Sequence, residues 1–315
     1  MKVNNWVYVT GAPRSGTTFV GKILSLPLQV DYIHEPFNPA CGIPEINQRY
    51  LYVRAAGEKS QTFKRITQKI FDYNFTLRTG YYKNDKPLQA FVKKFIGSRG
   101  PFYLRVAKLN PFHETAIIKD PIGCLLTEFI TQNFQINPLI LVRHPIAFAA
   151  SAMRLNWDEE VDLSHLLNQP ELIEDYFLDD IDFLKQKRNS SVEKAAALWR
   201  ALNKVLFIQS QRNSNWKVLT HEQLSSAPLE TFQELYTSFN LPWTKRVEKI
   251  IINSTHSKNS AEASKGTVQQ FSRDSSRIFE IRSKMLNLDQ RKAVFDITSD
   301  VALKFYSPDS FNING

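Results

Sequence analysis

The chain has 315 residues, of which 43% are hydrophobic, and it carries a formal net charge of +9. This length fits one large α/β domain or two small ones, and the apolar content is enough for a substantial core. No stretch approaches the roughly 20 consecutive apolar residues of a membrane-spanning helix, which argues against a transmembrane protein. The basic balance favours anionic partners such as nucleotides, acidic sugars, nucleic acid or a membrane surface, without choosing among them.

The chain contains two cysteines, Cys41 and Cys124. Neither belongs to a cluster of cysteines and histidines with the spacing of a metal site, so no metal is expected. The first residues also lack the pattern of a secretory signal peptide. These features predict a cytoplasmic protein with reduced thiols, and a single disulfide is the alternative.

The strongest motif lies near the N-terminus. Residues 6–10 form an apolar run that predicts a buried strand, and residues 17–26 predict a helix. Between them the sequence from Gly11 to Thr18 reads GAPRSGTT, with two glycines, one arginine and three hydroxyls. Backbone N–H groups and the dipole at a helix N-terminus favour an anion. The motif therefore predicts a phosphate or sulfate loop, and a βα turn without a ligand is the alternative.

This loop departs from the usual nucleotide-binding pattern G-x-x-x-x-G-K-[ST]. Gly11 and Gly16 have the expected spacing, and Thr18 stands in the Ser/Thr position. Thr17, however, takes the place of the lysine, and the positive charge lies at Arg14. A kinase or ATPase depends on that lysine and on Mg²⁺. A donor with a sulfuryl group in place of the terminal phosphates needs less of both.

A second apolar run, residues 30–33, predicts another short strand, which leads into His34 and Glu35. Because Pro36 disfavours a helical conformation at Glu35, this segment is expected to be extended or a turn. Ligands of open parallel sheets bind beyond the carboxyl ends of the strands. If this strand is a neighbour of the first one, His34 and Glu35 emerge beside the anion loop.

A third run, residues 138–142, is apolar without alternation and predicts a strand buried on both faces. Arg143 and His144 stand at its carboxyl end. The helix expected over residues 147–155 carries Ser151. Arg143 is therefore a second candidate for binding an anion, and His144 fits a structural position in the turn better than a catalytic one.

The rest of the chain alternates short strands with helices. Strands are expected at 103–109, 115–118 and 216–220, the last one buried. Helices are expected at 122–133, 191–211, 228–239, 246–252, 277–286 and 289–305, with a polar loop at 254–276. This alternation predicts a three-layer α/β, P-loop-like fold with a central parallel sheet. Without a recognisable linker, we expect a single domain over 1–315, with helical insertions at about 41–102 and 156–190.

Two segments have an unbalanced charge. Residues 45–100 are expected to be helical, and from Arg54 to Lys108 the chain has thirteen Lys or Arg against three acidic residues. This segment is either a solvated face or a surface for an anionic acceptor. Residues 158–182 contain ten acidic residues and no Lys or Arg, and they predict an amphipathic helix or lid. Their acidity indicates a solvated face, with a cationic partner as the alternative.

Two of these motifs together resemble the sulfotransferases that use 3′-phosphoadenosine 5′-phosphosulfate (PAPS). The GAPRSGTT segment looks like their 5′-phosphosulfate loop. The segment from Leu141 through Arg143 to Ser151 looks like their 3′-phosphate site, in which a serine follows an arginine by eight residues. The Lys119-Asp120-Pro121 segment also resembles a Lys-x-Pro segment of several branches. The arginine in the first loop points toward the bacterial or carbohydrate-type branches.

The resemblance implies roles for individual residues. The 5′-phosphosulfate would be held by Arg14, Ser15, Gly16, Thr17 and Thr18. The 3′-phosphate would be held by Arg143 and Ser151. Some members of the family add contacts from a late basic loop, for which Lys265 or Arg273 are the candidates here.

The base that takes the acceptor's proton is expected to be Glu35, because the segment His34-Glu35-Pro36-Phe37 looks like the Glu-Pro-Phe/Leu segment of these branches. His34 is the second candidate, since a histidine also suits proton transfer near neutral pH. Arg14 and Lys119 are candidates for contacting the leaving group.

The predicted reaction is transfer of a sulfuryl group to a hydroxyl or amine of a glycan or small metabolite, without a metal and without nucleic acid as a partner. The basic segment favours an anionic glycan as the acceptor. Two other functions stay open at this point: an ATP-dependent kinase on a related phosphate loop, and a non-catalytic protein that binds a nucleotide or glycan.

Overall fold

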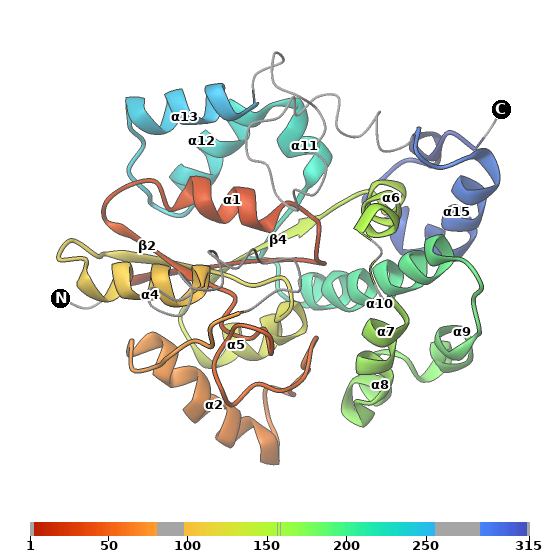
Figure 1. Cartoon of the computed structure of the whole chain (residues 1–315), viewed down its shortest axis with the longest axis horizontal. Coiled ribbons are helices and arrows are strands. Elements are labelled where there is room, and N and C mark those ends of the chain that lie inside the picture. The colour runs from red at the N-terminus through yellow and green to blue at the C-terminus, as the bar shows by residue number, and fades with distance from the viewer. Residues whose placement is uncertain (1–2, 81–97, 156, 158, 256–283, 314–315) are drawn as a thin grey trace, which may run out of the picture.

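The computed structural model describes residues 3–80, 98–155, 157, 159–255 and 284–313. Five parallel strands form a central sheet in the order β2-β3-β1-β4-β5 (Figure 1). The strands are β1 (Asn5–Thr10), β2 (Val30–His34), β3 (Thr115–Lys119), β4 (Asn137–Val142) and β5 (Lys217–Thr220). A helix is the next element in the chain after β1, β4 and β5, so the predicted α/β fold with a central parallel sheet is confirmed.

One face of the sheet is covered by α1 (Thr17–Leu24), α11 (His221–Ser226), α12 (Pro228–Ser238) and α13 (Lys245–Thr255) (Figure 1). Val7 and Val9 of β1 pack there against Val20 and Ile23 of α1. The other face is covered by α2 (Glu58–Phe71) and α5 (Thr127–Asn133), where Tyr8 of β1 belongs to a core with Phe63 and Phe129. Successive side chains of a strand point to opposite faces, so alternate residues of β1 supply the two cores.

A further core lies beyond β4 and centres on α10 (Ser191–Arg212), which packs against α6 (Pro145–Leu155) and α15 (Leu288–Ala302). The alanines of α6 are fully buried, which lets the two helices approach closely. At the opposite edge of the sheet, α4 (Arg99–Leu109) packs along β2. This helix covers an edge strand that would otherwise expose unpaired backbone groups.

The acidic segment forms three short helices, α7 (Glu159–Leu167), α8 (Pro170–Tyr176) and α9 (Ile181–Lys185). Among the acidic side chains that the structure describes in this segment, six form ion pairs: Glu160, Asp162, Glu171, Glu174, Asp175 and Asp180. Three of their partners, Lys194, Arg200 and Lys204, belong to α10. The other three, Arg49, Arg54 and Lys59, belong to the basic segment. Much of the acidic charge is thus neutralised within the chain, where the sequence predicted a solvated face or a cationic partner.

Some local predictions were wrong. Residues 103–109 are helical and belong to α4, because Gly100, Leu104 and Ala107 are buried together at the spacing of one helical face. Strand β5 is an edge strand whose first two residues are exposed, and not a buried one.

The segment expected to be helical over 45–100 is helical, within its described part, only in α2 and the start of α4. The helix expected at 277–286 and most of the loop at 254–276 fall outside the described residues. The single domain over 1–315 and its two insertions stay predictions.

Candidate active site

The carboxyl ends of the five strands line up along one edge of the sheet, and a polar residue or the anion loop lies at each of them. In spatial order these are Glu35 after β2, Lys119 at the end of β3, the anion loop after β1, Arg143 after β4 and His221 after β5. The register aligns Lys119 with both His34 and Val9. The condition that β1 and β2 are neighbours is therefore not met, because β3 lies between them and places Lys119 between the anion loop and Glu35.

The anion loop, residues 11–16, turns sharply where β1 meets α1. Gly11 has a φ of 137°, and a Cβ built there would lie 2.1 Å from the Leu141 carbonyl oxygen, so the loop passes directly against β4. Gly16 precedes α1 with a φ of 94°, and Arg14 has a φ of 72°, which is rare for a residue with a side chain. Two positive-φ glycines and one strained arginine therefore shape this loop.

The loop presents donors at the start of α1. The N–H groups of Phe19 and Val20 donate to the Gly16 carbonyl oxygen at 3.0 and 3.1 Å, so helical hydrogen bonding begins there. The Ser15 side chain is 1% exposed, and its Oγ has no hydrogen-bond partner among the described residues. A buried hydroxyl without a partner costs free energy unless a ligand or water satisfies it. A buried, unpartnered hydroxyl beside the start of a helix is typical of an anion site.

The two segments predicted to bind anions meet each other. Arg14 Nε donates to Ser151 Oγ at 3.2 Å, and Arg143 Nη1 donates to the Arg14 carbonyl oxygen at 2.9 Å. The Arg143 carbonyl oxygen accepts a hydrogen bond of 2.7 Å from Trp199 Nε1, which ties the end of β4 to α10. The structure thus brings Arg14, Arg143 and Ser151 together, with the Arg14 side chain directed toward Ser151.

Glu35 lies at the other end of this edge in a network of polar contacts. Its Oε1 pairs with Lys119 Nζ, and its Oε2 accepts a hydrogen bond of 2.6 Å from Asn38 Nδ2. Burial opposes the charged form, but the charge of Lys119 and the hydrogen bonds from Lys119 and Asn38 outweigh it and lower the pKa of the Glu35 carboxyl. Glu35 is therefore an ionised carboxylate at neutral pH.

Lys119 is fully buried, although it is the last residue of β3 and lies at the carboxyl end of the sheet. Its aliphatic stem lies close to Gly21 of α1, where an added Cβ would be 3.1 Å from Lys119 Cβ. A buried ammonium requires a partner, and Glu35 supplies it. The sequence indicated Lys119 only through the Lys-x-Pro segment, and its pairing with Glu35 depends on the strand order.

His34 is next to Glu35 but differs in character. Its side chain is buried, its Nδ1 lies 3.2 Å from the Tyr32 hydroxyl, and its Nε2 lies 3.9 Å from Glu35 Oε1. Burial and the positive charge of Lys119 lower the pKa of His34 to about 3. His34 is thus a neutral and weakly basic imidazole at neutral pH.

Asp120 was not predicted as a site residue, yet it holds the Glu35 segment in place. Its Oδ2 accepts a hydrogen bond of 2.6 Å from the Phe37 N–H, and its Oδ1 accepts from Ile122 and Gly123 N–H at 3.0 Å each. Burial, together with the charge of Glu35, raises the pKa of the Asp120 carboxyl. Asn38, which donates to the Glu35 carboxylate, was not predicted as a site residue either. Its position three residues after Glu35 is typical of a contact within a turn and could have indicated it.

The two histidines at the other end of the edge contact neighbouring segments of the chain. His144 Nδ1 accepts from the Ile146 N–H at 3.3 Å, and its Nε2 lies 3.0 Å from Ser310 Oγ. His221 lies beside Gly16, where a built Cβ would be 3.0 Å from His221 Cδ2. The preceding residue, Thr220, caps α11 with a capping box to Gln223. The structural interpretation of His144 agrees with these contacts.

Two predicted residues, Lys265 and Arg273, lie outside the described residues. In the part of the chain that the structure describes, no group of three or more His, Cys, Asp or Glu side chains could hold a metal ion. Within the same residues, none of the helices has the length and apolar character needed to cross a membrane.

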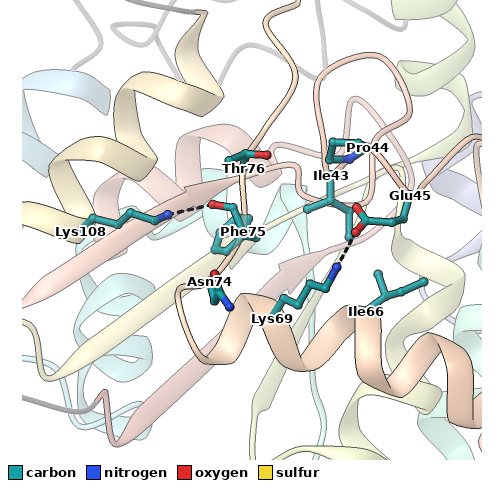
Figure 2. A pocket seen from close by; sticks show the side chains of 9 residues that line it. All are labelled: Ile43, Pro44, Glu45, Ile66, Lys69, Asn74, Phe75, Thr76 and Lys108. Atoms are coloured by element: carbon teal, nitrogen blue, oxygen red, sulfur yellow. Dashed lines mark hydrogen bonds and ion pairs between the residues drawn. The ribbon is translucent and has the colours of Figure 1, made fainter.

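A cavity of about 280 Å³ lies away from this edge, between α2, the 43–45 and 74–76 segments and Lys108 of α4 (Figure 2). Lys69 pairs with Glu45 across it at 2.7 Å, and Lys108 Nζ donates to the Phe75 carbonyl oxygen at 2.8 Å (Figure 2). Its charged groups therefore have partners within the protein.

Comparison with known proteins identifies the family. A model of the sulfotransferase family matches residues 7–245, which are 239 of the 315 residues. Three solved structures are similar at low identity. They are the sulfotransferase domain of the Synechococcus PCC 7002 olefin synthase (14% identity, TM-score 0.44, 98% of this chain and 98% of that one), sulfotransferase STF9 from Mycobacterium avium (11%, 0.44, 97% and 78%) and a sulfotransferase from Alicyclobacillus acidocaldarius (13%, 0.41, 99% and 100%).

The comparison with curated proteins finds no match. The family match includes the anion loop, the Glu35 segment, Lys119, Arg143 and Ser151. Because it extends over far more than half of the chain, the chain belongs to the sulfotransferase family and is an enzyme that transfers sulfuryl groups.

Proposed function

We propose that the enzyme takes its sulfuryl group from PAPS and that the donor lies along the carboxyl edge of the sheet. The observation that carries this proposal is the meeting of two anion-binding segments, where Arg14 contacts Ser151 and Arg143 contacts the Arg14 carbonyl oxygen. PAPS has a 5′-phosphosulfate and a 3′-phosphate, which two adjacent anion sites would suit. The buried Ser15 hydroxyl and the close passage of Gly11 along β4 fit a loop built for a phosphate or sulfate.

In this proposal the anion loop holds the 5′-phosphosulfate with Arg14, Ser15, Gly16, Thr17 and Thr18. Arg143 and Ser151 hold the 3′-phosphate. Arg14 lies at the junction of the two groups, since its side chain is hydrogen-bonded to Ser151. Its guanidinium offers several donors and can contact two oxygens at once. When bound, PAPS supplies the sulfuryl group, and its nucleotide leaves with the bonding electron pair.

Glu35 takes the proton of the acceptor hydroxyl or amine in the proposed reaction. Its carboxylate is ionised and held in one orientation by Lys119 and Asn38, as a general base requires. The low pKa makes it a weak base while Lys119 is paired with it. Lys119, placed between Glu35 and the anion loop, has a second use in stabilising charge on the oxygens of the transferring group.

His34 is the weaker candidate for the base, because its side chain is more buried than that of Glu35, at 9% against 15% exposed, and its Nδ1 lies against the Tyr32 hydroxyl. The pKa values of both groups are lowered and do not separate them. We therefore assign proton transfer to Glu35 and a packing role to His34, whose ring lies among Tyr32 and Tyr103.

The acceptor side of the site carries positive charge. The charges of Lys119, Arg99 and Lys22 all lower the pKa of His34, which places these cations around the end of β2. Lys22 Nζ also lies 5.3 Å from the centre of the Tyr103 ring. An anionic glycan or small anionic metabolite is the acceptor that this environment favours. The two free cysteines, both buried, support the prediction of a cytoplasmic enzyme.

Calorimetry with the product nucleotide tests the donor site. We expect adenosine 3′,5′-bisphosphate to bind at least about tenfold more tightly than AMP, because a second phosphate gains charge-assisted hydrogen bonds. Arg143→Gln should remove most of that difference, and Arg65→Gln on the exposed face of α2 should leave it unchanged. If the two nucleotides bind the wild-type protein equally, the assignment of Arg143 and Ser151 is wrong.

Turnover with PAPS and a panel of hydroxyl and amine acceptors tests the base. Glu35→Gln keeps an oxygen for Lys119 but loses the proton acceptor, so kcat should fall by about 100-fold or more. The affinity for the product nucleotide should change by less than about threefold, which also reports that the variant is folded. Glu45→Gln, which breaks a Lys–Glu pair outside the site, is the matched control. Unchanged turnover in Glu35→Gln would exclude Glu35 as the base.

A further inference from the structure

The outer face of α4 carries an exposed apolar stripe. Phe102, Val106 and Leu109 follow one another at positions i, i+4 and i+7, and they are 46%, 52% and 81% exposed. The opposite face of the same helix is already buried through Leu104 and Ala107. The stripe is thus not the core-facing side of the helix, and its apolar area is in contact with solvent.

The stripe continues past the end of the helix. Asn110 donates through Nδ2 to the Leu28 carbonyl oxygen at 2.9 Å, and its Oδ1 accepts from the Phe112 N–H at 3.0 Å. Leu28 and Phe112 are therefore neighbours of the helix end, and they are 69% and 60% exposed. Half of the ten large hydrophobic side chains that are exposed in the described part of the chain belong to this surface. We call these five residues, with α4, the α4 face.

The charged side chains of α4 have one sign. Arg99 and Arg105 are exposed, and the helix contains no Asp or Glu. Lys108 lies on another side of the helix, where it donates to the Phe75 carbonyl oxygen. Exposed aromatic and aliphatic side chains beside Lys and Arg are typical of a helix that lies in a lipid interface, where phosphate groups meet the cations and acyl chains meet the apolar side chains. The net charge of +9 favours the same approach to an anionic surface.

We propose that the α4 face docks on the surface of an anionic lipid bilayer. The helix lies along the edge strand β2, on the border of the sheet (Figure 1). Its first turn is beside the end of β2, because Gly100 lies against the His34 carbonyl oxygen. A bilayer on this face would extend along β2 without covering the anion loop, which lies two strands away.

Vesicle cosedimentation of the full chain tests the proposal, with vesicles of phosphatidylcholine alone and of phosphatidylcholine mixed with phosphatidylglycerol. We expect binding to the mixed vesicles to be at least about tenfold tighter than to the neutral ones, and to weaken as salt is raised. The triple variant Phe102→Ser, Leu109→Ser, Phe112→Ser should lose about tenfold or more in binding to the mixed vesicles. Arg105→Gln should lose less, because it removes one charge and keeps the apolar contacts.

The matched control is the double variant Leu178→Ser, Leu303→Ser, which removes exposed leucines outside the α4 face and should bind vesicles like the wild type. The assay needs neither nucleotide nor turnover, so its outcome is independent of the proposed donor and base. The proposal is overturned if the wild type binds neither kind of vesicle, or both equally. It is also overturned if the triple variant binds like the wild type, or if the wild type forms a dimer in solution that the triple variant abolishes.

Discussion

Glu35 has a φ of 49°, a left-handed backbone conformation that is uncommon for a residue with a side chain. Its N–H donates to the Lys119 carbonyl oxygen at 2.8 Å, and its carbonyl oxygen accepts from the Asn38 N–H at 3.2 Å. Such conformations persist only where neighbouring contacts determine them, and they concentrate at functional sites. The hydrogen bond from Phe37 N–H to Asp120 holds the next part of the same turn. Asp120 is thus a positioning residue for the Glu35 carboxylate.

We predict that the substitution Asp120→Asn lowers kcat by loosening the turn that contains Glu35. The Asn oxygen can still accept from Ile122 and Gly123 N–H, but its NH₂ group would face the Phe37 N–H, so one hydrogen bond is lost. We expect kcat to fall by about tenfold or more, since a displaced base loses its geometry, while nucleotide affinity changes less than about threefold. Steady-state kinetics and calorimetry measure the two quantities.

The control is Asp162→Asn, a buried aspartate of α7 that accepts from Tyr50 and pairs with Arg49. It should lower stability without lowering kcat. A purely structural role for Asp120 would make the two variants alike in kcat, and that result would contradict the assignment.

The loop between β1 and α1 depends on how closely it passes along β4. Gly11 can adopt its φ of 137° without a Cβ, and its position leaves no space for one because of the Leu141 carbonyl oxygen. Gly57, which precedes α2, has the same φ of 137° but nothing within 4 Å of a built Cβ. Comparing an alanine substitution at each of the two glycines therefore separates the free-energy cost of backbone strain from that of a steric clash.

We predict that Gly11→Ala destabilises the protein by about 3 kcal/mol or more, because strain and a backbone clash add. Gly57→Ala should cost only the strain, on the order of 1–3 kcal/mol. Urea unfolding measures both free energies. Gly11→Ala should also weaken product-nucleotide binding in any folded fraction, and Gly57→Ala should not. Equal destabilisation of the two variants would mean that the loop can move away from β4.

Across the whole molecule, buried histidines link stability to pH. Burial lowers the pKa of His144 to about 3, with the charge of Arg143 as a second cause, whereas an unfolded chain has a histidine pKa of about 6.5. Below about pH 6.5 the unfolded chain therefore binds a proton that folded His144 does not bind. The contribution of His144 to stability is present above that pH and is lost as the pH falls. Asp120 acts in the opposite direction, because its pKa is raised in the folded protein.

Titration of the other groups cancels in the difference between the unfolding free energies of the wild type and His144→Asn. The stability of the wild type relative to His144→Asn should fall by up to about 1.4 kcal/mol per pH unit between roughly pH 6.5 and pH 4. An Asn oxygen can replace Nδ1 as the acceptor for the Ile146 N–H, which keeps the variant folded. Urea unfolding at several pH values measures the slope. A difference that is independent of pH would show that folded His144 also binds the proton.

Much of the fold and of the site could be predicted from local patterns. The apolar runs before Gly11, His34 and Arg143 gave three strands of the parallel sheet, because a strand buried on both faces requires continuous apolar residues. The glycine spacing and the cluster of hydroxyls indicated an anion site, because these residue types suit the start of a helix. The family that these motifs resemble is confirmed by the match over residues 7–245.

Only the tertiary structure decided which strands are neighbours. Strand order depends on pairing between segments far apart in the chain, and local patterns do not record it. Because β3 lies between β1 and β2, Lys119 forms an ion pair with Glu35. Asp120, the next residue, accepts a hydrogen bond from the Phe37 N–H and so holds the turn that contains Glu35. The partners of the acidic segment and the exposed side of α4 were fixed in the same way, because ion pairing and burial depend on what packs against each residue. The sequence by itself therefore determined the chemistry available at the site, and the fold determined which groups meet there.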